Sequence, residues 1–388
     1  MKKICVVINS RANYGTVKSV LRAASEHKDV DLQIVTNGAA NIEKYGCVSD
    51  LMVKDGYFIN ESFDSLVEGE NLLSMVKTVG MNLIQLPNTL DKLRPDVVVT
   101  VGDRYETISN AIAASFMNIP VAHIMGGEVS GTIDENVRHA ITKLSHVHFP
   151  ATKLSAERII KMGENPKSVY TVGCPRIDLV REYVFSDTQN HFDDAREEII
   201  MTGVGDKIDP TEDFILLNFH PVTTEYEKTH DQIDSILKVL DEFKLPVIGL
   251  WPNSDAGSAF VSRSLRIWRE SNYNRYKIRM FKNLSIKTYM WLMDKTKCQV
   301  GNSSSGIREG SYIGTPVVNI GTRQVNRERA ENVIDVGFDS NTIREAIQHQ
   351  LIHTKYNSSE LYGSGDAGIQ IIDRLAAIEI EIHKRMSY

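Results

Sequence analysis

Residues 94–106, RPDVVVTVGDRYE, decide the fold class of this chain. Val97–Val101 is a β-branched run without polar alternation, which predicts a parallel strand covered on both faces. Arg94-Pro95-Asp96 leads into the run, and Gly102-Asp103-Arg104 predicts a turn at its end. The helical pattern of Tyr105–Met117 follows directly. A buried strand that turns at once into a helix is the repeating unit of a doubly wound α/β sheet.

The same unit recurs through the first half of the chain. Five further apolar runs predict strands: Ile4–Ile8, Asp31–Thr36, Pro120–Ile124, Val147–Pro150 and Ser168–Val172. The first of these runs leads through NSRANYG into a helical pattern over Tyr14–His27. Because an open α/β sheet binds its ligands beyond the carboxyl ends of its strands, we expect the site in the loops that follow these runs.

The pattern weakens and then restarts, which predicts two domains. Residues 1–175 form a first α/β domain, residues 176–210 a charged helical linker, and residues 211–365 a second α/β domain. The strands predicted in the second domain are Phe214–Asn218, Val247–Leu250, Cys298–Val300 and Val317–Ile320. Residues 366–388 are predicted as a C-terminal helix, with its pattern over Ile369–Lys384, that packs back on the first domain.

Composition excludes several classes of function. The chain has 388 residues, with 44 Lys and Arg against 50 Asp and Glu, so its formal net charge is −6 and a nucleic-acid-binding face is not expected. The four cysteines lie far apart without metal-ligand spacing, which argues against a zinc site and a disulfide framework. The N-terminal apolar run is too short for a signal peptide, and no run reaches the ~20 residues of a membrane span. We therefore expect a cytoplasmic protein that has no metal and no membrane or nucleic-acid partner.

The segment GNSSSGIREG, residues 301–310, predicts a phosphate site. Small hydroxyl residues and glycines at a strand-to-helix turn let backbone N–H groups approach a diphosphate, and a helix N-terminus favours its charge. Ser303 and Ser304 are the candidates, and an ordinary capped helix is the alternative. Glu309 follows one to two turns later, where it either accepts hydrogen bonds from ribose hydroxyls or favours the helix dipole.

Three side chains on other strand-end loops are candidates for contact with an anion. His220 begins HPVTTE after the predicted strand Phe214–Asn218, where a structural histidine is the alternative. Arg11 in NSRANYG and Arg323 in GTRQ are cations on two such loops, and arginine forks onto phosphate oxygens. Together they indicate local positive charge in the site of an acidic protein.

The acid–base candidates lie in the first domain. Asp103 and Arg104 place a carboxylate beside a guanidinium just past a strand, either as an ion pair and helix cap or as part of a site. The segment HIMGGEVSGTIDENVRHAITKL gathers more ionisable residues: His123, Glu128, Asp134, Glu135, Arg138 and His139. If a helix begins near Asp134, then Asp134 and Arg138 share one of its faces. They form a surface pair or a carboxylate set for proton transfer, and the spacing leaves both open.

With these motifs the chain resembles the hydrolysing UDP-N-acetylglucosamine 2-epimerase family. The matching segments run in order along the chain: RANYG, GDRYE, GGEVSGTIDE, RHAITKL, HPVTT, PNSDAGS, GNSSSGIRE, GTPVVN and GTRQ. The resemblance implies two Rossmann-like doubly wound parallel-sheet domains facing a central cleft, the GT-B type. It implies conversion of UDP-N-acetylglucosamine and water to UDP and N-acetylmannosamine through a glycal, for sialic acid synthesis. It also implies no cofactor and a homodimer or homotetramer.

The resemblance assigns roles residue by residue. Those implied to bind UDP are Arg11, His220, Asn253, Asn283, Leu284, Ser303, Ser304, Glu309 and Arg323. The serines and His220 hold the diphosphate, Glu309 holds the ribose, and the stretch Lys282-Asn283-Leu284 corresponds to the uracil pocket. Those implied to serve catalysis are Asp103, Asp134, Glu128, Arg104, Arg138, His123 and His220.

Two positions depart from the family pattern. Asn13 stands in RANYG where the family often has RADY, so an amide replaces a carboxylate. Met125 stands where the family's HIEGGE loop has an acid–base glutamate, and methionine cannot transfer protons. Either Glu128 or Asp134 takes over, or the substrate differs. The resemblance then points to UDP-2,4-diacetamido-2,4,6-trideoxyglucose of legionaminic acid synthesis, whose 6-deoxy sugar suits a more apolar pocket.

Three other functions are compatible with these residues. A non-hydrolysing epimerase would keep UDP on the sugar, although the GGEVSGTIDE and GTRQ segments favour the hydrolysing branch. A GT-B glycosyltransferase would pass the sugar to an acceptor. A nucleotide-sugar sensor would bind without turnover, and Met125 is the residue that raises this alternative.

Overall fold

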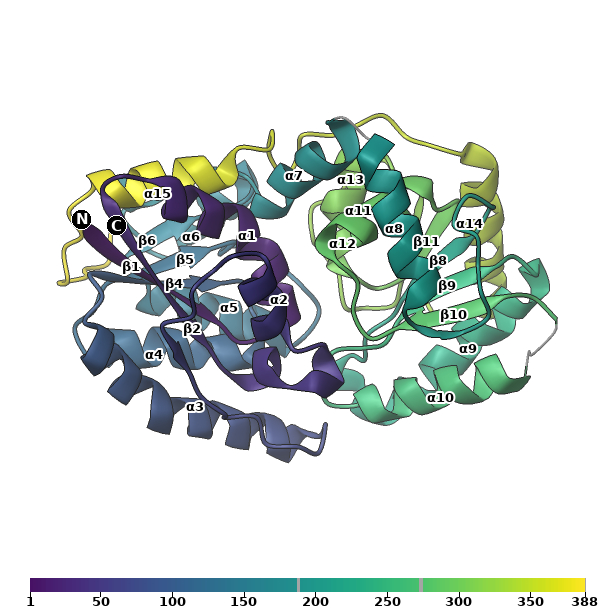
Figure 1. Cartoon of the computed structure of the whole chain (residues 1–388), viewed down its shortest axis with the longest axis horizontal. Coiled ribbons are helices and arrows are strands. Elements are labelled where there is room, and N and C mark those ends of the chain that lie inside the picture. The colour runs from purple at the N-terminus through teal and green to yellow at the C-terminus, as the bar shows by residue number, and fades with distance from the viewer. Residues whose placement is uncertain (187–188, 272–274, 388) are drawn as a thin grey trace. The chain divides into compact units, whose positions relative to one another are not determined.

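A computed structural model describes residues 1–186, 189–271 and 275–387 (Figure 1). The chain divides into two compact units within helix α7, Pro175–Val180. The first unit comprises Met1–Val129, Ile133–Asp178 and Tyr362–Tyr388, and the second comprises Ser130–Thr132 and Leu179–Leu361. No helix in the described ranges has both the length and the apolar character that crossing a membrane requires.

The first unit is built on a parallel sheet with strand order β3-β2-β1-β4-β5-β6. Its strands are β1 Lys2–Ile8, β2 Val30–Thr36, β3 Glu61–Ser62, β4 Val97–Val101, β5 Val121–Ile124 and β6 Val147–Phe149. The strand order reverses between β1 and β4, so the loops after these two strands flank the crevice where doubly wound sheets bind ligands.

Helices cover both faces of this sheet. They are α1 Arg11–Glu26, α2 Val48–Lys54, α3 Leu72–Leu93, α4 Ile108–Phe116, α5 Ile133–Leu144, α6 Lys153–Lys161 and α15 Ala367–Ala377. The helices α3, α4 and α5 pack side by side on one face, whereas α1 and α15 pack together on the other (Figure 1). Leu86, Val98 and Ile141 are fully buried in the core that joins the sheet to the α3–α5 layer.

The second unit repeats this plan with the order β13-β12-β11-β8-β9-β10-β7, in which the short edge strand β7 is antiparallel. Its strands are β7 Val204–Gly205, β8 Ile215–Asn218, β9 Val247–Leu250, β10 Ile278–Phe281, β11 Cys298–Gly301, β12 Val317–Ile320 and β13 Val333–Val336. Its helices are α8 Gln189–Met201, α9 Thr229–Phe243, α10 Ser258–Ser271, α11 Ile286–Lys295, α12 Ser304–Ile307, α13 Glu309–Ile313 and α14 Ser340–His353. Here the order reverses between β8 and β11.

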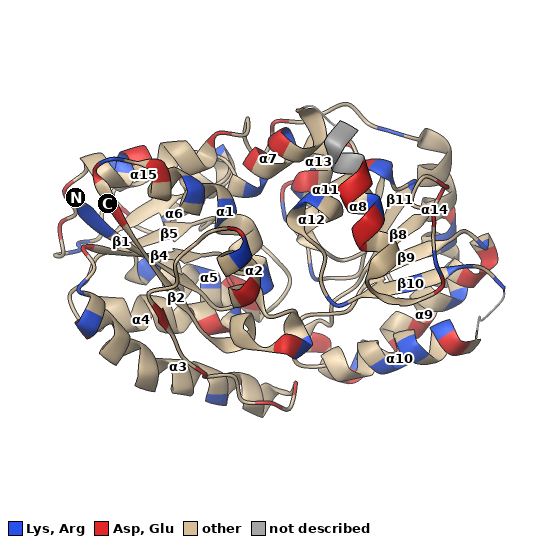
Figure 2. Ribbon diagram, in the orientation of Figure 1, with Lys and Arg blue, Asp and Glu red and all other residues tan. Residues whose placement is uncertain are grey.

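Short 3₁₀ and π segments complete the secondary structure. The 3₁₀ turns are Gly38–Asn41, Glu43–Tyr45, Tyr105–Thr107, Pro166–Ser168 and Thr223–Lys228, and a π turn spans Arg181–Phe185. Lysine and arginine are interspersed with aspartate and glutamate along both units (Figure 2). This distribution agrees with the expectation that a ligand's charge is met locally rather than on one basic face.

The predicted linker, residues 176–210, is wrong. Helix α8 packs against α11, and its Ala195 and Ile199 are fully buried in the second unit's core. Charged side chains such as Glu197 occupy its exposed positions, so an amphipathic helix resembled a solvated linker.

The predicted C-terminal helix over Ile369–Lys384 ends early. Helix α15 stops at Ala377, and Ile378 already has an extended backbone. The cause lies in the sequence IEIEI, where Ile378, Ile380 and Ile382 alternate with glutamates. A period of two suits an extended chain and not a helix. The segment predicted as a strand, Ser168–Val172, forms only one bridge, from Val169 to His148.

Candidate active site

Polar residues of the first unit gather where its strand order reverses. Ser10 follows β1 and caps α1, because its Oγ accepts a hydrogen bond from the backbone N–H of Asn13 at 3.4 Å. The Asn13 Nδ2 donates to the carbonyl of Val101, the last residue of β4, at 3.4 Å. An amide at position 13 therefore joins the two loops through a donor that an aspartate lacks.

The central ion pair of this unit joins Asp103 and Arg138. Arg138 on α5 is fully buried, and its Nη2 donates to the carboxylate of Asp103 just past β4. Its Nη1 donates to the backbone carbonyl of Glu128 at 2.8 Å. Burial alone would lower the pKa of Arg138, but the carboxylates of Asp103, Glu128 and Asp134 reverse this effect and raise it. The guanidinium thus stays charged and fixes one carboxylate relative to the Glu128 loop.

The fold gives these arginines partners beyond the ones that spacing indicated. Arg104 donates from Nε to Glu106 at 2.7 Å. Arg138 pairs with Asp103 across the fold, and the carboxylate of Asp134 is among the charges that raise its pKa. Asp134 itself is half-buried in the first turn of α5, and Glu128 is buried.

His123 on β5 is engaged at both ring nitrogens. Its Nε2 lies 2.9 Å from the carbonyl oxygen of Gly102, and its Nδ1 lies 3.2 Å from the hydroxyl of Thr142 on α5. Complete burial lowers the pKa of His123 to about 3, so the ring is neutral at physiological pH. It ties the turn that carries Asp103 to the helix that carries Arg138.

The loop after β5 holds Met125 in an unusual conformation. Met125 is buried and has a φ of 65°, in the left-handed region that favours glycine. Its Sδ accepts a hydrogen bond from the thiol of Cys174 at 3.7 Å. A Cβ on Gly127 would lie 2.2 Å from the carbonyl oxygen of Ser155, so the chain passes α6 too closely for a side chain. Backbone strain of this kind is common in loops that form active sites or ligand-binding sites.

In the second unit, Asn302 joins the loops that follow β8 and β11, where the strand order reverses. It follows β11, and its side chain exchanges two hydrogen bonds of 2.8 Å with the backbone of His220, which follows β8. The carbonyl of Asn302 also accepts from Arg323 Nη1 at 3.2 Å and from Gln324 Nε2 at 2.9 Å. The sequence did not single out Asn302 or Gln324. Their only signal was a position beside predicted site residues.

The serine-rich segment forms two short helices rather than one. Ser303 caps α12, and its Oγ accepts from the N–H of Ser305 at 3.3 Å. The Oγ of Ser304 accepts from Arg308 Nη2 at 2.7 Å. Arg308 ends α12, and α13 begins with Glu309, which is fully buried. Glu309 therefore does not lie one to two turns into a single helix, as the sequence predicted.

The remaining predicted UDP-binding residues also lie at carboxyl ends of strands in their own units. In the second unit Asn253 follows β9, Asn283 and Leu284 follow β10, and Arg323 follows β12. In the first unit Arg11 is the first residue of α1, directly after β1. Within the described ranges, no three or more His, Cys, Asp or Glu side chains are grouped so that they could hold a metal ion.

Fold and strand-end residues together define a two-domain α/β protein of the kind that binds nucleotide sugars, and the comparisons agree. The family model described as UDP-N-acetylglucosamine 2-epimerase matches residues 22–376, so the chain belongs to this family of UDP-sugar 2-epimerases. It is 33% identical to a UDP-N,N'-diacetylbacillosamine 2-epimerase (hydrolyzing) of Legionella pneumophila, over 98% of this chain and 97% of the relative.

Two further comparisons involve Neisseria meningitidis. A UDP-N-acetylglucosamine 2-epimerase of this organism is 29% identical, over 94% of this chain and 92% of the relative. The crystal structure of a UDP-GlcNAc 2-epimerase from the same organism, bound to UDP-GlcNAc, has a TM-score of 0.78 at 17% identity. The match covers 96% of this chain and 99% of the other. It confirms the predicted pair of GT-B-type parallel-sheet domains.

Proposed function

We propose that the protein is a hydrolysing 2-epimerase of a UDP-N-acetylated amino sugar. The observation that carries this proposal is the Asp103–Arg138 pair at the carboxyl end of the first sheet. A buried, permanently charged guanidinium holds one carboxylate there and the Glu128 loop beside it. Proton removal from carbon and its return need carboxylates held in fixed positions.

The proposed reaction balances as an elimination followed by an addition. A base removes the proton on C2 of the sugar, the C–H electron pair forms the C1–C2 double bond, and the C1–O bond breaks so that UDP leaves. Water then adds its oxygen to C1 of the glycal, and a proton returns to C2 on the opposite face. The products are UDP and the free 2-epimer, as the resemblance implies.

We assign the two proton transfers to Asp103 and Asp134, with Glu128 as the third candidate carboxylate. His123, neutral and hydrogen-bonded at both nitrogens, positions Gly102 and with it Asp103. In the second unit, His220, Ser303 and Arg323 would hold the departing diphosphate. Donors and cations arranged in advance around a leaving group stabilise the charge that develops on it.

Two sugars compete as the substrate. Met125 is buried against the thiol of Cys174, so an apolar sulfur surface takes the place of a carboxylate. Together with the Legionella relative, this favours UDP-2,4-diacetamido-2,4,6-trideoxyglucose, whose sugar is N,N'-diacetylbacillosamine. The Neisseria relative supports UDP-N-acetylglucosamine, which would be converted to N-acetylmannosamine.

The decisive experiment offers the purified protein each UDP-sugar in heavy water and follows the products by NMR. We expect UDP and a free reducing sugar that carries deuterium at C2, with faster turnover of the diacetamido sugar. A mixture of UDP-linked epimers would replace the proposal with a non-hydrolysing epimerase. Transfer to an acceptor without deuterium at C2 would indicate a glycosyltransferase. Tight UDP binding without turnover of either sugar would indicate a sensor.

Removal of one phosphate-binding group should weaken UDP binding. We expect Arg323→Ala to raise the Kd for UDP about tenfold or more, because a charge-assisted hydrogen bond contributes about 1.5–3 kcal/mol. Ser303→Ala should raise the Kd less, since a neutral hydroxyl forms weaker bonds. Isothermal titration calorimetry measures both values. Arg344→Ala is the control that should leave UDP affinity unchanged, because Arg344 is a partly exposed residue of α14 that pairs with Glu242 on α9.

We also propose that the enzyme is a homo-oligomer through the outer face of α3. Leu73, Val76 and Ile84 on this helix are more than 60% exposed, at 63%, 70% and 64%. Few charged residues interrupt the helix (Figure 2), and exposed apolar faces of this kind mark contact surfaces. Val76→Glu combined with Ile84→Glu should convert the oligomer to a monomer in analytical ultracentrifugation, whereas Val53→Glu on α2 should not. An unchanged sedimentation coefficient would move the interface elsewhere.

A further inference from the structure

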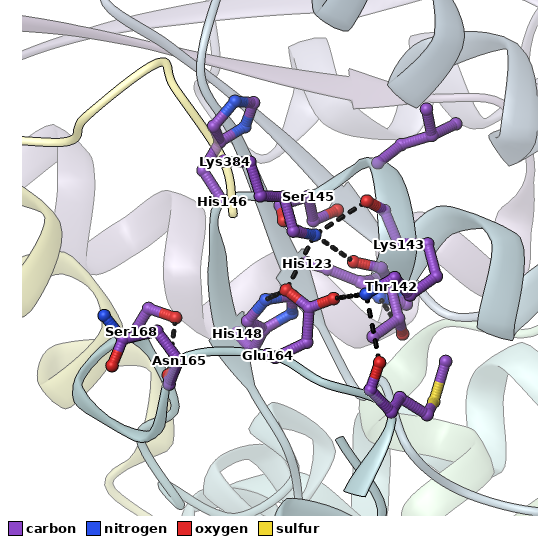
Figure 3. Close-up of polar contacts among 12 residues, drawn as sticks. His123, Thr142, Lys143, Ser145, His146, His148, Glu164, Asn165, Ser168 and Lys384 are labelled. Carbon is purple, nitrogen blue, oxygen red and sulfur yellow. Dashed lines mark hydrogen bonds and ion pairs between the residues drawn. The ribbon is translucent and has the colours of Figure 1, made fainter. Parts of the chain in front are cut away.

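A lysine in the C-terminal tail completes the end of helix α5 (Figure 3). The Nζ of Lys384 donates to the carbonyl oxygens of Thr142, Lys143 and Ser145 at 3.1, 2.7 and 2.6 Å. The last carbonyls of a helix have no partners within the helix, and their partial negative charge attracts a cation. Lys384 supplies both the donors and the charge, although it lies far from α5 in the sequence.

A buried carboxylate lies against this lysine. Burial lowers the pKa of Lys384, and the hydrogen bond and charge of Glu164 oppose that effect. The side chain of Glu164 is 1% exposed and lies 2.7 Å from Lys384 Nζ, 2.5 Å from Lys143 Nζ and 3.1 Å from His148 Nε2. Burial would raise the pKa of Glu164, but the hydrogen bonds from His148, Lys143 and Lys384 outweigh this effect and lower the pKa to about 2. The carboxylate is therefore ionised, and the contact is an internal ion pair rather than a solvated surface pair.

The tail is attached on both sides of Lys384. Before it, the carbonyl of Ile382 lies 3.2 Å from His146 Nε2. After it, the N–H of Ser387 donates to the carbonyl of Gly163 at 2.9 Å. These bonds fix the irregular segment against the ends of α5 and α6. They therefore fix the position of Lys384 as well.

The helix end that Lys384 holds leads directly to the acid–base residues. Thr142, whose carbonyl Lys384 binds, also places its hydroxyl 3.2 Å from His123 Nδ1. The other nitrogen of His123 lies 2.9 Å from the carbonyl of Gly102, which precedes Asp103. One turn earlier on α5, Arg138 binds Asp103 itself.

We infer that Lys384 is a positioning residue for catalysis, which sets α5, and through it His123 and Arg138, relative to Asp103. This inference rests on the proposed function for the role of Asp103. The tail would then act on the proton-transfer residues of the first unit and not on the UDP-binding residues of the second unit. Loss of Lys384 should therefore affect the chemical step rather than the binding of UDP.

The test compares Lys384→Met with wild-type enzyme in steady-state kinetics and calorimetry. We expect kcat to fall about 10- to 100-fold, because small displacements of catalytic groups cost that much. The Kd for UDP should stay within about twofold, since none of the proposed UDP contacts involves α5. Lys384→Arg, which keeps the charge and several donors, should recover most of kcat. If Lys384→Met does not fold, Lys384→Gln replaces it, with a smaller expected loss of kcat.

Lys2→Met is the matched control. The Nζ of Lys2 also binds a carbonyl near the tail, that of Ile378, but it makes no described contact with α5. Its loss should leave kcat unchanged. An equal loss of kcat in Lys2→Met and Lys384→Met would show a general effect of loosening the tail and would overturn the assignment to Lys384.

A second readout does not depend on turnover. The ¹⁵N NMR shifts of the His123 ring report its two hydrogen bonds, so they should move in Lys384→Met and not in Lys2→Met. If wild-type protein turns over neither sugar, the proposed function fails while these shifts still test the link from Lys384 to His123. Unchanged shifts, or an unchanged kcat in an active enzyme, would overturn the positioning role.

Discussion

Asp103→Asn is expected to lower kcat at least about 10³-fold, because an amide of the same shape cannot exchange a proton with C2 of the sugar. UDP should still bind, since the proposed diphosphate contacts lie in the second unit. The substitution also removes the negative charge that pairs with the fully buried Arg138. Breaking a buried pair costs about 3–5 kcal/mol of unfolding free energy. NMR turnover assays, UDP calorimetry and denaturant unfolding measure the three effects.

Two variants make this result specific. Asp134→Asn, on the same helix as Arg138, should also abolish turnover while keeping UDP affinity. Asp209→Asn changes an aspartate that pairs with Arg196 at 3.5 Å and accepts hydrogen bonds from Thr211, and it should leave kcat and UDP affinity unchanged. Near-normal kcat in Asp103→Asn or Asp134→Asn would remove that residue from the proton transfers and leave the carboxylate of Glu128 as the remaining candidate.

Most strands of the two parallel sheets could be predicted because buried parallel strands have uninterrupted apolar sequences. Val97–Val101, Val247–Leu250 and Val317–Ile320 have the predicted bounds. The strand β10, Ile278–Phe281, was not predicted because a charged residue interrupts its apolar run. The guanidinium of Arg279 turns to the edge and binds the carbonyls of Ile200, Thr202, Gly205 and Asp206. Only the folded edge supplies those acceptors.

The position of each site residue after a strand could be predicted, but its partner could not. Sequence spacing offered Asp103 as a partner of Arg104 and Asp134 as a partner of Arg138. It gave no sign of the partners that the fold adds, which are Glu106 for Arg104 and Asp103 for Arg138. Partner choice depends on which loops the strand order places side by side, and this information is not local. The role of Lys384 is hidden for the same reason, because α5 and the tail are far apart in the sequence and meet only in the folded chain.

Arg138→Lys keeps the positive charge and tests the geometry of the pair. A guanidinium binds the Asp103 carboxylate and the Glu128 carbonyl at once, whereas an ammonium on a shorter reach meets only one of them well. We expect kcat to fall about 10²-fold, as for a misplaced catalytic group. The unfolding free energy should fall by about 1.5–3 kcal/mol for one lost charge-assisted bond. Kinetics with either UDP-sugar and urea unfolding measure the two quantities.

Two further variants help to interpret Arg138→Lys: Arg138→Leu removes the charge, and Arg344→Lys is the control. Arg138→Leu leaves Asp103 without its cation and should lose more stability than Arg138→Lys, with no recovery of kcat. Arg344→Lys changes a partly exposed arginine on α14 and should alter neither quantity. If Arg138→Lys lost stability but kept full kcat, charge alone would suffice at position 138. The fork between Asp103 and the Glu128 loop would then be a feature of folding and not of catalysis.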